Sequence, residues 1–265
     1  MTGDIFAGTT VLITGASSGI GAAFAEELAS SGARLVLTGR DAVRLDAVAG
    51  LARARGATVE AVAIDLASPE GVATLLHRLA SDGIEVDHLI NNAGAGVQGE
   101  ATIASVEAQL NVIDLNIHAT TELALRLLPG MLQKRRGGIL NVASIAAFQG
   151  MPRMSVYAAS KSYILSWSEA LHFELRGTGV RCVCLCPGPV DSRFFDAAGM
   201  QKPPAIFSMQ APTEAARAGL RAYRRSASHS MSGLLPRTLA WLTRITPRMI
   251  SAAVASGFSR PREVS

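Results

Sequence analysis

The sequence predicts an α/β fold in which one doubly wound parallel sheet carries helices on both faces. Short, almost continuously apolar segments alternate with segments whose apolar residues recur at helical spacing. A glycine-rich turn joins the first apolar segment to the first helical one. The 265 residues are 49% hydrophobic and 17% charged, which excludes a disordered chain and allows a sizeable core.

The apolar segments have the length of buried strands. Their apolar residues hardly alternate with polar ones, which is typical of parallel strands covered on both faces. A weaker segment near the C-terminus is a candidate last strand. We expect strands at Val11–Thr14, Leu35–Thr38, Val59–Ile64, His88–Asn91, Ile139–Ala143, Val180–Cys186 and, weakly, Ser228–Ser230.

Helices are expected between these strands. Ser68 is a plausible cap for one of them, with Pro69 at its first helical position. Right-handed crossovers then give a doubly wound sheet, whose ligands bind beyond the carboxyl ends of the strands. The expected helices are Ile20–Ser31, Arg44–Arg55, Pro69–Ser81, Ser105–Leu128, Ser155–Arg176 and Thr213–Ser226.

Several protein classes are disfavoured. No apolar run reaches the roughly 18 residues that a membrane-spanning helix needs. Met1–Gly8 contains Asp4 and lacks a basic start followed by an apolar stretch, so we expect no secretory signal and a cytoplasmic protein.

The three cysteines lie together in the run Cys182, Cys184 and Cys186. Residues two apart on a strand share a face, so a metal or redox cluster is one interpretation. A buried strand with small apolar side chains is the favoured one, because no second Cys or His cluster completes a metal site. We therefore expect no bound metal.

The net charge of +4 is unevenly distributed. Residues 215–265 hold nine Arg, no Lys and a single acidic residue, a net charge of +8, so residues 1–214 carry −4. The short basic run at 134–136 lacks interleaved aromatic residues, and we interpret it as a solvated helix end. We therefore expect no nucleic-acid partner.

The glycine-rich turn has the spacing G-x-x-x-G-x-G. It is neither the G-x-G-x-x-G pattern nor a P-loop, but glycines there allow a tight turn and a close approach to a pyrophosphate. The following helix begins with free N–H groups that favour an anion. A plain strand–helix turn is the alternative. The residues concerned are Gly15, Ser17, Ser18, Gly19, Ile20 and Gly21.

The second strand ends at Gly39 and Arg40, close to where a dinucleotide site carries a ribose-binding carboxylate or a phosphate-binding arginine. Gly39 offers no carboxylate, and a guanidinium suits a 2′-phosphate. These two features favour NADP(H) over NAD(H). In the alternative interpretation Arg40 is a solvated turn residue and Asp41 binds the ribose.

Tyr157 and Lys161 lie four residues apart in a helical segment and therefore on one face. An ammonium beside a phenol favours the phenolate and is expected to lower the pKa of Tyr157. Alone, this pair could be a surface contact. Ser144 follows directly after a predicted strand, at the ligand-binding edge, where its hydroxyl could bind a developing oxyanion.

Together these motifs resemble those of the short-chain dehydrogenase/reductase family, and the resemblance implies a Rossmann-like sheet. It covers about residues 8–195, in the family's order and spacing. The matching residues are Thr14–Gly21, Asp65, Asn91–Gly94, Asn116, Ser144, Tyr157, Lys161 and Pro187–Val190.

The resemblance implies a role for each catalytic residue. Tyr157 would give a proton to the carbonyl oxygen, or take one from the alcohol, as general acid or base. Lys161 would hold the nicotinamide ribose, and Ser144 would orient the carbonyl oxygen. Asn116 would hold a water that connects Lys161 to solvent.

The resemblance also assigns the cofactor contacts. Asp65 and Leu66 would flank the adenine. Asn92, Ala93 and Gly94 would lie along the adenosine ribose. The nicotinamide would lie beside the loop after the last long strand, at Pro187, Gly188 and Val190.

We expect one domain over residues 1–265, with a substrate lid and a C-terminal helical extension at 196–265. The run 234–250 is apolar and basic, and its layout is loosely similar to that of long-chain 3-oxoacyl reductases and 17β-hydroxysteroid dehydrogenases. It could be a helix over the substrate site, a peripheral membrane contact, or a binding surface for an acyl-CoA phosphate. Between Ser144 and Tyr157, a loop with Phe148, Gln149, Met151 and Met154 indicates an apolar substrate.

The sequence thus predicts an NADPH-dependent oxidoreductase for the carbonyl or secondary alcohol of an apolar substrate. A 3-oxoacyl-thioester reductase of lipid metabolism is the alternative enzyme. A non-catalytic NADPH-sensing protein is the alternative of another class. The resemblance also implies a homodimer, formed by the two long helices at 105–128 and 155–176.

Overall fold

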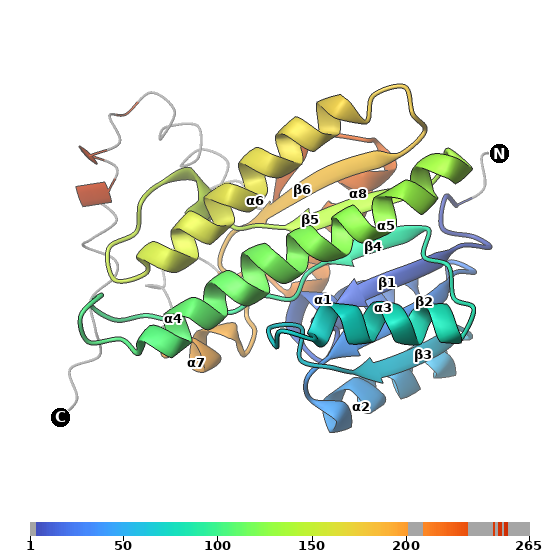
Figure 1. Cartoon of the computed structure of the whole chain (residues 1–265), viewed down its shortest axis with the longest axis horizontal. Helices are drawn as coiled ribbons and strands as arrows, with labels where there is room; N and C mark the ends of the chain where they lie inside the picture. Colours follow the sequence, from blue (N-terminus) through green and yellow to red (C-terminus); the bar gives the residue numbers. More distant parts are fainter. Residues whose placement is uncertain (1–3, 201–208, 233–245, 247–248, 251, 254–265) are drawn as a thin grey trace.

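The computed structural model describes residues 4–200, 209–232, 246, 249, 250, 252 and 253. A seven-stranded sheet, all of whose strands are parallel, runs in the order β3-β2-β1-β4-β5-β6-β7 (Figure 1). The strand order reverses between β1 and β4, which confirms the doubly wound fold. The strands are β1 Thr10–Thr14, β2 Arg34–Gly39, β3 Thr58–Ala63, β4 His88–Asn91, β5 Gly138–Val142, β6 Arg181–Pro187 and β7 His229–Ser232.

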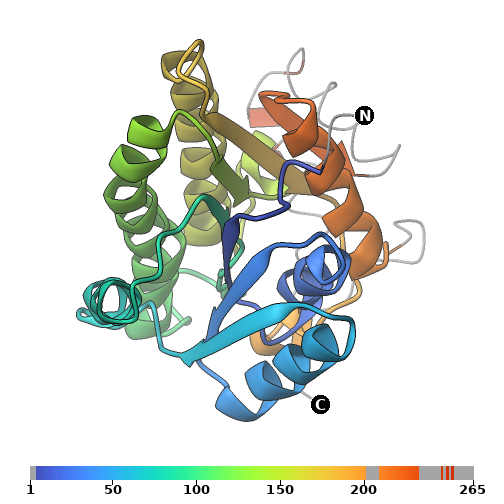
Figure 2. The same ribbon diagram turned by 90° about the vertical axis from the view of Figure 1, so that its right-hand side faces the viewer.

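Helices cover both faces of the sheet (Figure 2). Side chains of α1, α2 and α8 form one apolar cluster with the sheet, and side chains of α3, α5 and α6 form a second one on the other face. The helices are α1 Gly19–Leu28, α2 Ala42–Ala54, α3 Gly71–Ser81, α4 Val106–Ile113, α5 Thr120–Lys134, α6 Ser155–Glu174, α7 Phe194–Ala197 and α8 Pro212–Arg224, with short turns η1 Asp114–Ala119 and η2 Ile145–Phe148.

The unbroken apolar character of the strands is explained by this two-sided burial. In β1, Val11 and Ile13 belong to one cluster and Leu12 to the other. All three side chains are fully buried. The cysteines of β6 are likewise buried and free, which confirms the favoured interpretation of that strand.

Two expected helices differ from the structure. The helix expected from Pro69 begins at Gly71, because Ser68 closes the preceding turn. The hydroxyl of Ser68 donates to the carbonyl of Asp65 at 2.8 Å, and the carbonyl of Ser68 accepts the N–H of Gly71 at 3.0 Å. The expected capping role of Ser68 was therefore wrong. The helix expected at 105–128 is divided into α4, the π-helical turn η1 and α5, and it continues to Lys134 with Pro129 inside.

The basic run at 134–136 lies at the end of α5 with Arg135 and Arg136 exposed, as expected of a solvated helix end, but it also binds a buried carboxylate. Asp87, in front of β4, is buried and accepts hydrogen bonds from Lys134 at 3.1 Å, Arg136 at 3.2 Å and the N–H of Thr10 at 3.0 Å. Burial alone would raise the pKa of Asp87, but these donors lower it overall. The cluster ties the amino ends of β1 and β4 to the end of α5.

The weak last strand is confirmed as β7, which pairs in parallel with β6. The apolar and basic run at 234–250 lies outside the described residues except for Thr246, Met249 and Ile250. No helix in the part of the chain that the structure describes is long and apolar enough to cross a membrane. The described residues also contain no group of three or more His, Cys, Asp or Glu side chains that could hold a metal ion.

His88 is a buried titratable group in this core. It is 2% exposed, and its Nδ1 lies 2.7 Å from the hydroxyl of Tyr223. Burial lowers the pKa of His88 to about 4, although the adjacent Asp87 opposes the shift. Between about pH 4 and 6.5, the imidazole of His88 therefore stays neutral in the folded protein, whereas it would bind a proton in the unfolded chain.

We predict an acid-sensitive contribution of His88 to stability. Its folded pKa lies below the unfolded value, so the contribution is present above about pH 6.5 and disappears as the pH falls towards 4, with a maximum of about 3 kcal/mol. Urea unfolding at pH 7, 5.5 and 4.5 should show a smaller acid loss for His88→Asn than for the wild type, since Asp87 is common to both. Equal losses in the two proteins would refute the assignment.

Candidate active site

The glycine-rich turn lies at the carboxyl edge of the sheet, between β1 and α1. Gly15 and Gly19 have positive φ angles of 64° and 57°. A Cβ on Gly15 would lie 2.8 Å from the Cα of Ala93, and one on Gly21 would lie 2.2 Å from the carbonyl oxygen of Gly15. Only glycine leaves the turn folded this tightly against the segment after β4.

Hydrogen bonds hold these two segments together. The hydroxyl of Thr14 accepts the N–H groups of Asn92 and Ala93 at 3.0 and 2.9 Å. The amide of Asn92 donates to the carbonyls of Thr14 and Gly15 at 2.9 and 3.1 Å. The expectation for Asn92 was a ribose contact, whereas its side chain here joins two loops. Sequence reasoning assigned no role to Thr14.

The turn leaves polar groups available to a ligand. Ser18 precedes α1 without capping it through its side chain, so the first N–H groups of the helix are open to an anion. Ser17 lies against the end of β2, since a Cβ on Gly39 would be 3.3 Å from the hydroxyl oxygen of Ser17. The residue after Gly39 therefore lies beside the turn.

That residue, Arg40, is exposed, and the structure assigns it no hydrogen bond or ion pair within the described ranges. Asp41 is engaged instead: its carboxylate caps α2 by accepting the N–H of Arg44 at 3.0 Å and also binds the Arg44 Nε at 2.6 Å. These bonds hold the pKa of Asp41 below its usual value. The alternative in which Asp41 binds a ribose is disfavoured by this pairing.

The expected adenine contacts follow β3, next to the end of β2. The N–H of Ile64 donates to the carbonyl of Gly39 at 3.1 Å, which brings the two strand ends together. Asp65 is exposed and accepts the N–H of Ala67 at 3.0 Å. Leu66 is buried in the cluster below.

Ser144, Tyr157 and Lys161 lie together at the end of β5. Ser144 precedes η2, where its hydroxyl accepts the N–H of Ala146 at 3.1 Å, and it is hydrogen-bonded to Tyr157. Tyr157 and Lys161 lie one turn apart near the start of α6, and both are buried. The Nζ of Lys161 donates to the carbonyl of Val142 at 2.9 Å and lies 5.9 Å from the ring centroid of Tyr157.

Burial controls the protonation of this pair. It raises the pKa of Tyr157 to about 12, against the hydrogen bond to Ser144, and it lowers the pKa of Lys161 to about 8. The expectation of a lowered pKa for Tyr157 was therefore wrong for this arrangement. The reason is that Lys161 is directed at the Val142 carbonyl, while the phenol itself is removed from water.

Asn116 reaches the same place from the π-helical turn. Its side chain is 1% exposed, accepts the N–H of Ala95 at 2.8 Å and donates to the Ala95 carbonyl at 3.0 Å. A Cβ on Gly94 would lie 3.3 Å from both Asn116 Oδ1 and Lys161 Nζ. Gly94 thus leaves room for these two side chains to come together.

The segment after β6 covers the other side of the turn. Pro187 ends the strand and is followed by Gly188, and Val190 forms a bridge with Gln210. A Cβ on Gly19 would lie 3.2 Å from the Cβ of Ser192, so this segment approaches the glycine-rich turn directly. Every residue that the sequence predicted for the site thus lies at the carboxyl edge of one sheet.

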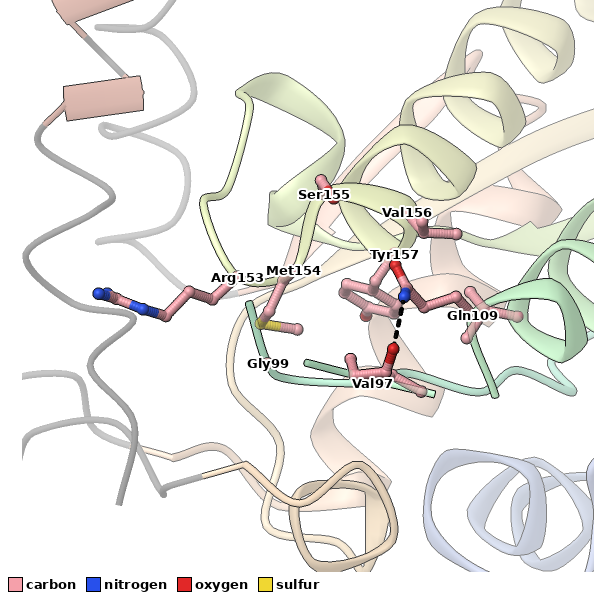
Figure 3. Close-up of a pocket in the computed structure, with 10 residues that line it drawn as sticks. Val97, Gly99, Gln109, Arg153, Met154, Ser155, Val156 and Tyr157 are labelled. Atoms are coloured by element: carbon pink, nitrogen blue, oxygen red, sulfur yellow. Dashed lines mark hydrogen bonds between the residues drawn. The ribbon is translucent and has the colours of Figure 1, made fainter. Parts of the chain in front are cut away.

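A small hollow of about 10 Å³ opens beside Tyr157 (Figure 3). Its lining mixes apolar side chains, among them Val97, Val112 and Met154, with the polar side chains of Gln109, Arg153 and Ser155. The sequence singled out Met154 and also Met151, which packs with the same cluster. Phe148 is partly buried and packs against a cluster that contains two of the cysteines of β6.

The ring of Phe194 lies 5.3 Å from that of Tyr157, centroid to centroid. A Cβ on Gly96 would lie 2.7 Å from Phe194, so a glycine is needed where the ring packs. Sequence reasoning missed Phe194 and Val97, because neither belongs to a motif.

Comparison with known proteins agrees with the family that the sequence motifs resemble. The sequence pattern of a family described as short chain dehydrogenase matches residues 9–202. The ketoacyl reductase HetN of Nostoc is 32% identical over 217 residues, which are 82% of this chain and 76% of that protein.

Two solved structures are also similar. A short-chain dehydrogenase from Sphingobium yanoikuyae in complex with NADPH has a TM-score of 0.80 and 34% identity, over 89% of this chain and 93% of that one. A short-chain dehydrogenase/reductase from Burkholderia phymatum in complex with NAD has a TM-score of 0.81 and 28% identity, over 98% and 99% of the two chains. The cofactors of these two neighbours differ.

We predict that Gly21→Ala weakens dinucleotide binding by at least about tenfold, because the added Cβ meets the carbonyl of Gly15 and opens the turn. Fluorescence titration with NADPH and NADH measures the effect. Gly50→Ala is the matched control: no atom lies within 4 Å of its added Cβ, and it should stabilise α2 by about 0.5–1 kcal/mol without changing binding. Unchanged binding in Gly21→Ala would contradict the assignment of this turn.

Proposed function

Because the chain belongs to the short-chain dehydrogenase/reductase family of oxidoreductases, which use a nicotinamide cofactor, we propose that it reduces the carbonyl of an apolar substrate with NADPH, or oxidises the corresponding secondary alcohol. The observation that carries the proposal is the convergence of Asn116, Ser144, Tyr157 and Lys161 beside the glycine-rich turn.

The residues at the edge fit a dinucleotide. A side chain at Gly15 or Gly21 would fill the turn, and the start of α1 offers N–H groups to a pyrophosphate. The further contacts that we propose come from the same turn and the start of α1, from the segments after the other strands, and from α6. They are Ser17, Ser18, Gly19, Ile20, Arg40, Asp65, Leu66, Asn92, Ala93, Gly94, Pro187, Gly188, Val190, Tyr157 and Lys161.

Bound NADPH would supply the hydride, and the protein would control the proton. Ser144 and Tyr157 bind the carbonyl oxygen, and Tyr157 gives its phenolic proton to that oxygen as the alcohol forms. Lys161 holds the nicotinamide ribose, and Asn116 positions a water that returns the proton from solvent.

Tyr157 is protonated at neutral pH, as the acid role requires. Burial raises its pKa to about 12, so the phenol holds a proton that it can give to the carbonyl oxygen. When the alcohol is oxidised, the same oxygen takes the proton back, so Tyr157 serves both directions of the reaction.

Arg40 supports NADPH as the cofactor. Arg40 directly follows Gly39, which lies against Ser17 of the turn, while Asp41, the adjacent carboxylate, is engaged by Arg44. A carboxylate at this point would bind a ribose 2′-hydroxyl and repel a 2′-phosphate, whereas an arginine binds the phosphate.

We predict that Arg40→Ala weakens NADPH binding by about 10–100-fold and leaves NADH binding nearly unchanged, since only NADPH carries the 2′-phosphate. Isothermal titration with both cofactors measures the ratio. The control is Arg34→Ala, an exposed arginine at the opposite end of the same strand, which should change neither affinity. A wild type that prefers NADH, with the preference unchanged in Arg40→Ala, would overturn the choice of NADPH.

We propose an apolar substrate because Val97, Val112 and Met154 lie beside Tyr157, while Gln109 and Arg153 give the same hollow polar groups at its edge. A 3-oxoacyl-thioester reductase is the second candidate, supported by the ketoacyl reductase from Nostoc. NADPH oxidation should be measured with 3-oxoacyl thioesters of graded chain length, steroids and aromatic ketones. A rate that rises with acyl length favours the lipid substrate, and NADPH binding without any turnover favours the sensing protein.

We predict that Tyr157→Phe abolishes this turnover, by a factor of at least about 10², and retains NADPH binding, because only the transferable proton is removed. Tyr163→Phe is the control on the same helix: its hydroxyl contacts Thr121 at 3.2 Å, away from the site. Near-normal turnover in Tyr157→Phe would refute the catalytic assignment.

We also propose a homodimer. The continuous helix formed by α4, η1 and α5 lies beside α6, and both expose large apolar side chains, which in water favour contact with a second copy (Figure 1). The residues concerned are Val106, Leu110, Leu125, Tyr163 and Phe173.

We predict that Leu125→Arg shifts the protein towards monomer in light scattering after gel filtration, since the charge must be buried in the interface. Leu51→Arg is the control, because Leu51 is similarly exposed but lies on α2 at the opposite face of the sheet. A monomeric wild type, or no effect of Leu125→Arg, would contradict the dimer.

A further inference from the structure

Ser160 is a buried hydroxyl between two groups of the candidate active site. It precedes Lys161 in α6 and is fully buried. Its hydroxyl donates to the carbonyl of Tyr157 at 2.7 Å and accepts the side-chain amide of Asn116 at 2.9 Å. Sequence analysis assigned it no role.

The hydrogen bonds of Asn116 show what this hydroxyl does. The carboxamide of Asn116 accepts the N–H of Ala95, and its two amide protons go to the Ala95 carbonyl and to Ser160. Ser160 thus uses the last amide proton of Asn116 and prevents rotation of the carboxamide. Without Ser160, one buried N–H would have no acceptor.

The orientation of the hydroxyl is also fixed. A serine inside a helix can donate back to a carbonyl one turn earlier, and Ser160 does so to Tyr157. Its proton is thereby directed along α6, and its lone pairs face Asn116. The π-helical turn is therefore bonded to the turn of α6 that carries Tyr157 and Lys161.

We propose that Ser160 is a positioning residue of the site: its hydroxyl fixes Asn116 against α6, and so fixes the segment Gly94–Ala95 relative to Tyr157 and Lys161. The inference rests on the proposed function, because it assigns Ser160 an effect on turnover. Gly94 gives the geometric reason, since a Cβ there would lie 3.3 Å from both Asn116 Oδ1 and Lys161 Nζ, so both side chains border the same glycine. A shift of Asn116 would therefore change the space beside Lys161.

The chain contains a matched control on the same helix. Ser168 is also fully buried, donates to the carbonyl of Ile164 at 2.6 Å and accepts the side-chain amide of Asn141 at 2.9 Å. Both serines thus make the same two kinds of bond. Only Ser160 joins residues of the candidate site.

The experiment compares Ser160→Ala with Ser168→Ala in NADPH oxidation by the fastest ketone of the panel. Both variants should lose similar stability in urea unfolding. We expect kcat to fall about tenfold in Ser160→Ala, with KM little changed, and to stay near the wild-type value in Ser168→Ala. In an Asn116→Ala background, Ser160→Ala should add less than about a twofold loss, since its effect acts through Asn116. Ser160→Cys keeps the volume with weaker hydrogen bonds and should be intermediate.

A second measurement does not depend on turnover. The N–H of Ala95 donates to Asn116, so its hydrogen exchange, followed by NMR, reports whether the carboxamide is held. We expect about tenfold faster exchange in Ser160→Ala, or a smaller increase in Ser160→Cys if the alanine variant does not fold, and no change in Ser168→Ala.

Tyr157→Phe, measured beside these variants, separates this inference from the proposed function. An active Tyr157→Phe overturns the proposed function, and the exchange of Ala95 still decides whether Ser160 holds Asn116. The other outcome is an inactive Tyr157→Phe together with two serine variants that do not differ. If Ser160→Ala and Ser168→Ala have equal kcat and equal exchange at Ala95, the role of Ser160 is overturned and the proposed function is not.

Discussion

The close contact between the glycine-rich turn and the segment after β4 is the constraint on which the rest of the site depends. β1 and β4 are neighbours in the sheet although 73 residues separate Thr14 from His88, and their carboxyl ends meet where the strand order reverses. Two backbones can approach this closely only if Cβ atoms are missing at Gly15 and Gly21. The hydroxyl of Thr14 and the amide of Asn92 then hold the contact. The position of the segment around Gly94, and through it of Asn116 and Lys161, follows from this contact.

Burial of polar groups is the second constraint. Asn116, Tyr157 and Lys161 are withdrawn from water, so each needs a partner inside the protein. The partners are mostly backbone groups, those of Ala95 for Asn116 and that of Val142 for Lys161. Because backbone atoms of strands and helices move little, these hydrogen bonds hold the side chains of Asn116 and Lys161 in fixed positions without a bound substrate. The same burial holds the phenol in its protonated form.

Much of the fold could be predicted from the sequence, because local patterns determine it. The strands were found to within about two residues, since their apolar runs are buried on both faces and Gly or Asn follows most of them. The π-helical turn at Asp114–Ala119 could not be predicted, because it is stabilised by contacts of Asn116 with residues distant in the sequence. The direction of the Tyr157 pKa shift was missed for a similar reason: spacing shows that Lys161 is near, but not that the Val142 carbonyl binds it or how much water reaches the phenol. The bond of Lys134 to Asp87 was likewise missed, because no local pattern displays a partner that lies 47 residues away. The role of Ser68 depends on a local choice instead, since its hydroxyl bonds back to Asp65 and not forward to the helix.

The part of the site that we assign to the cofactor and the part that we assign to the substrate are built from different structural elements. Short sequence motifs therefore indicate the cofactor and the reaction, but not the substrate. The cofactor side consists of strand ends and glycine turns, whose shape is set by backbone contacts and is therefore visible in short motifs. The substrate side consists of side chains such as Val97, Met154 and Phe194, which come from loops and short helices. The hydrogen bonds that hold Thr14, Asn116 and Lys161 are made with residues of the sheet ends, α6 and the segment after β4. None of these three bonds involves Val97, Met154 or Phe194, so a substitution at those positions leaves the bonds in place. Under the proposed function, a scaffold arranged in this way would keep one proton-transfer geometry, while the side chains around Tyr157 would decide which carbonyl reaches it.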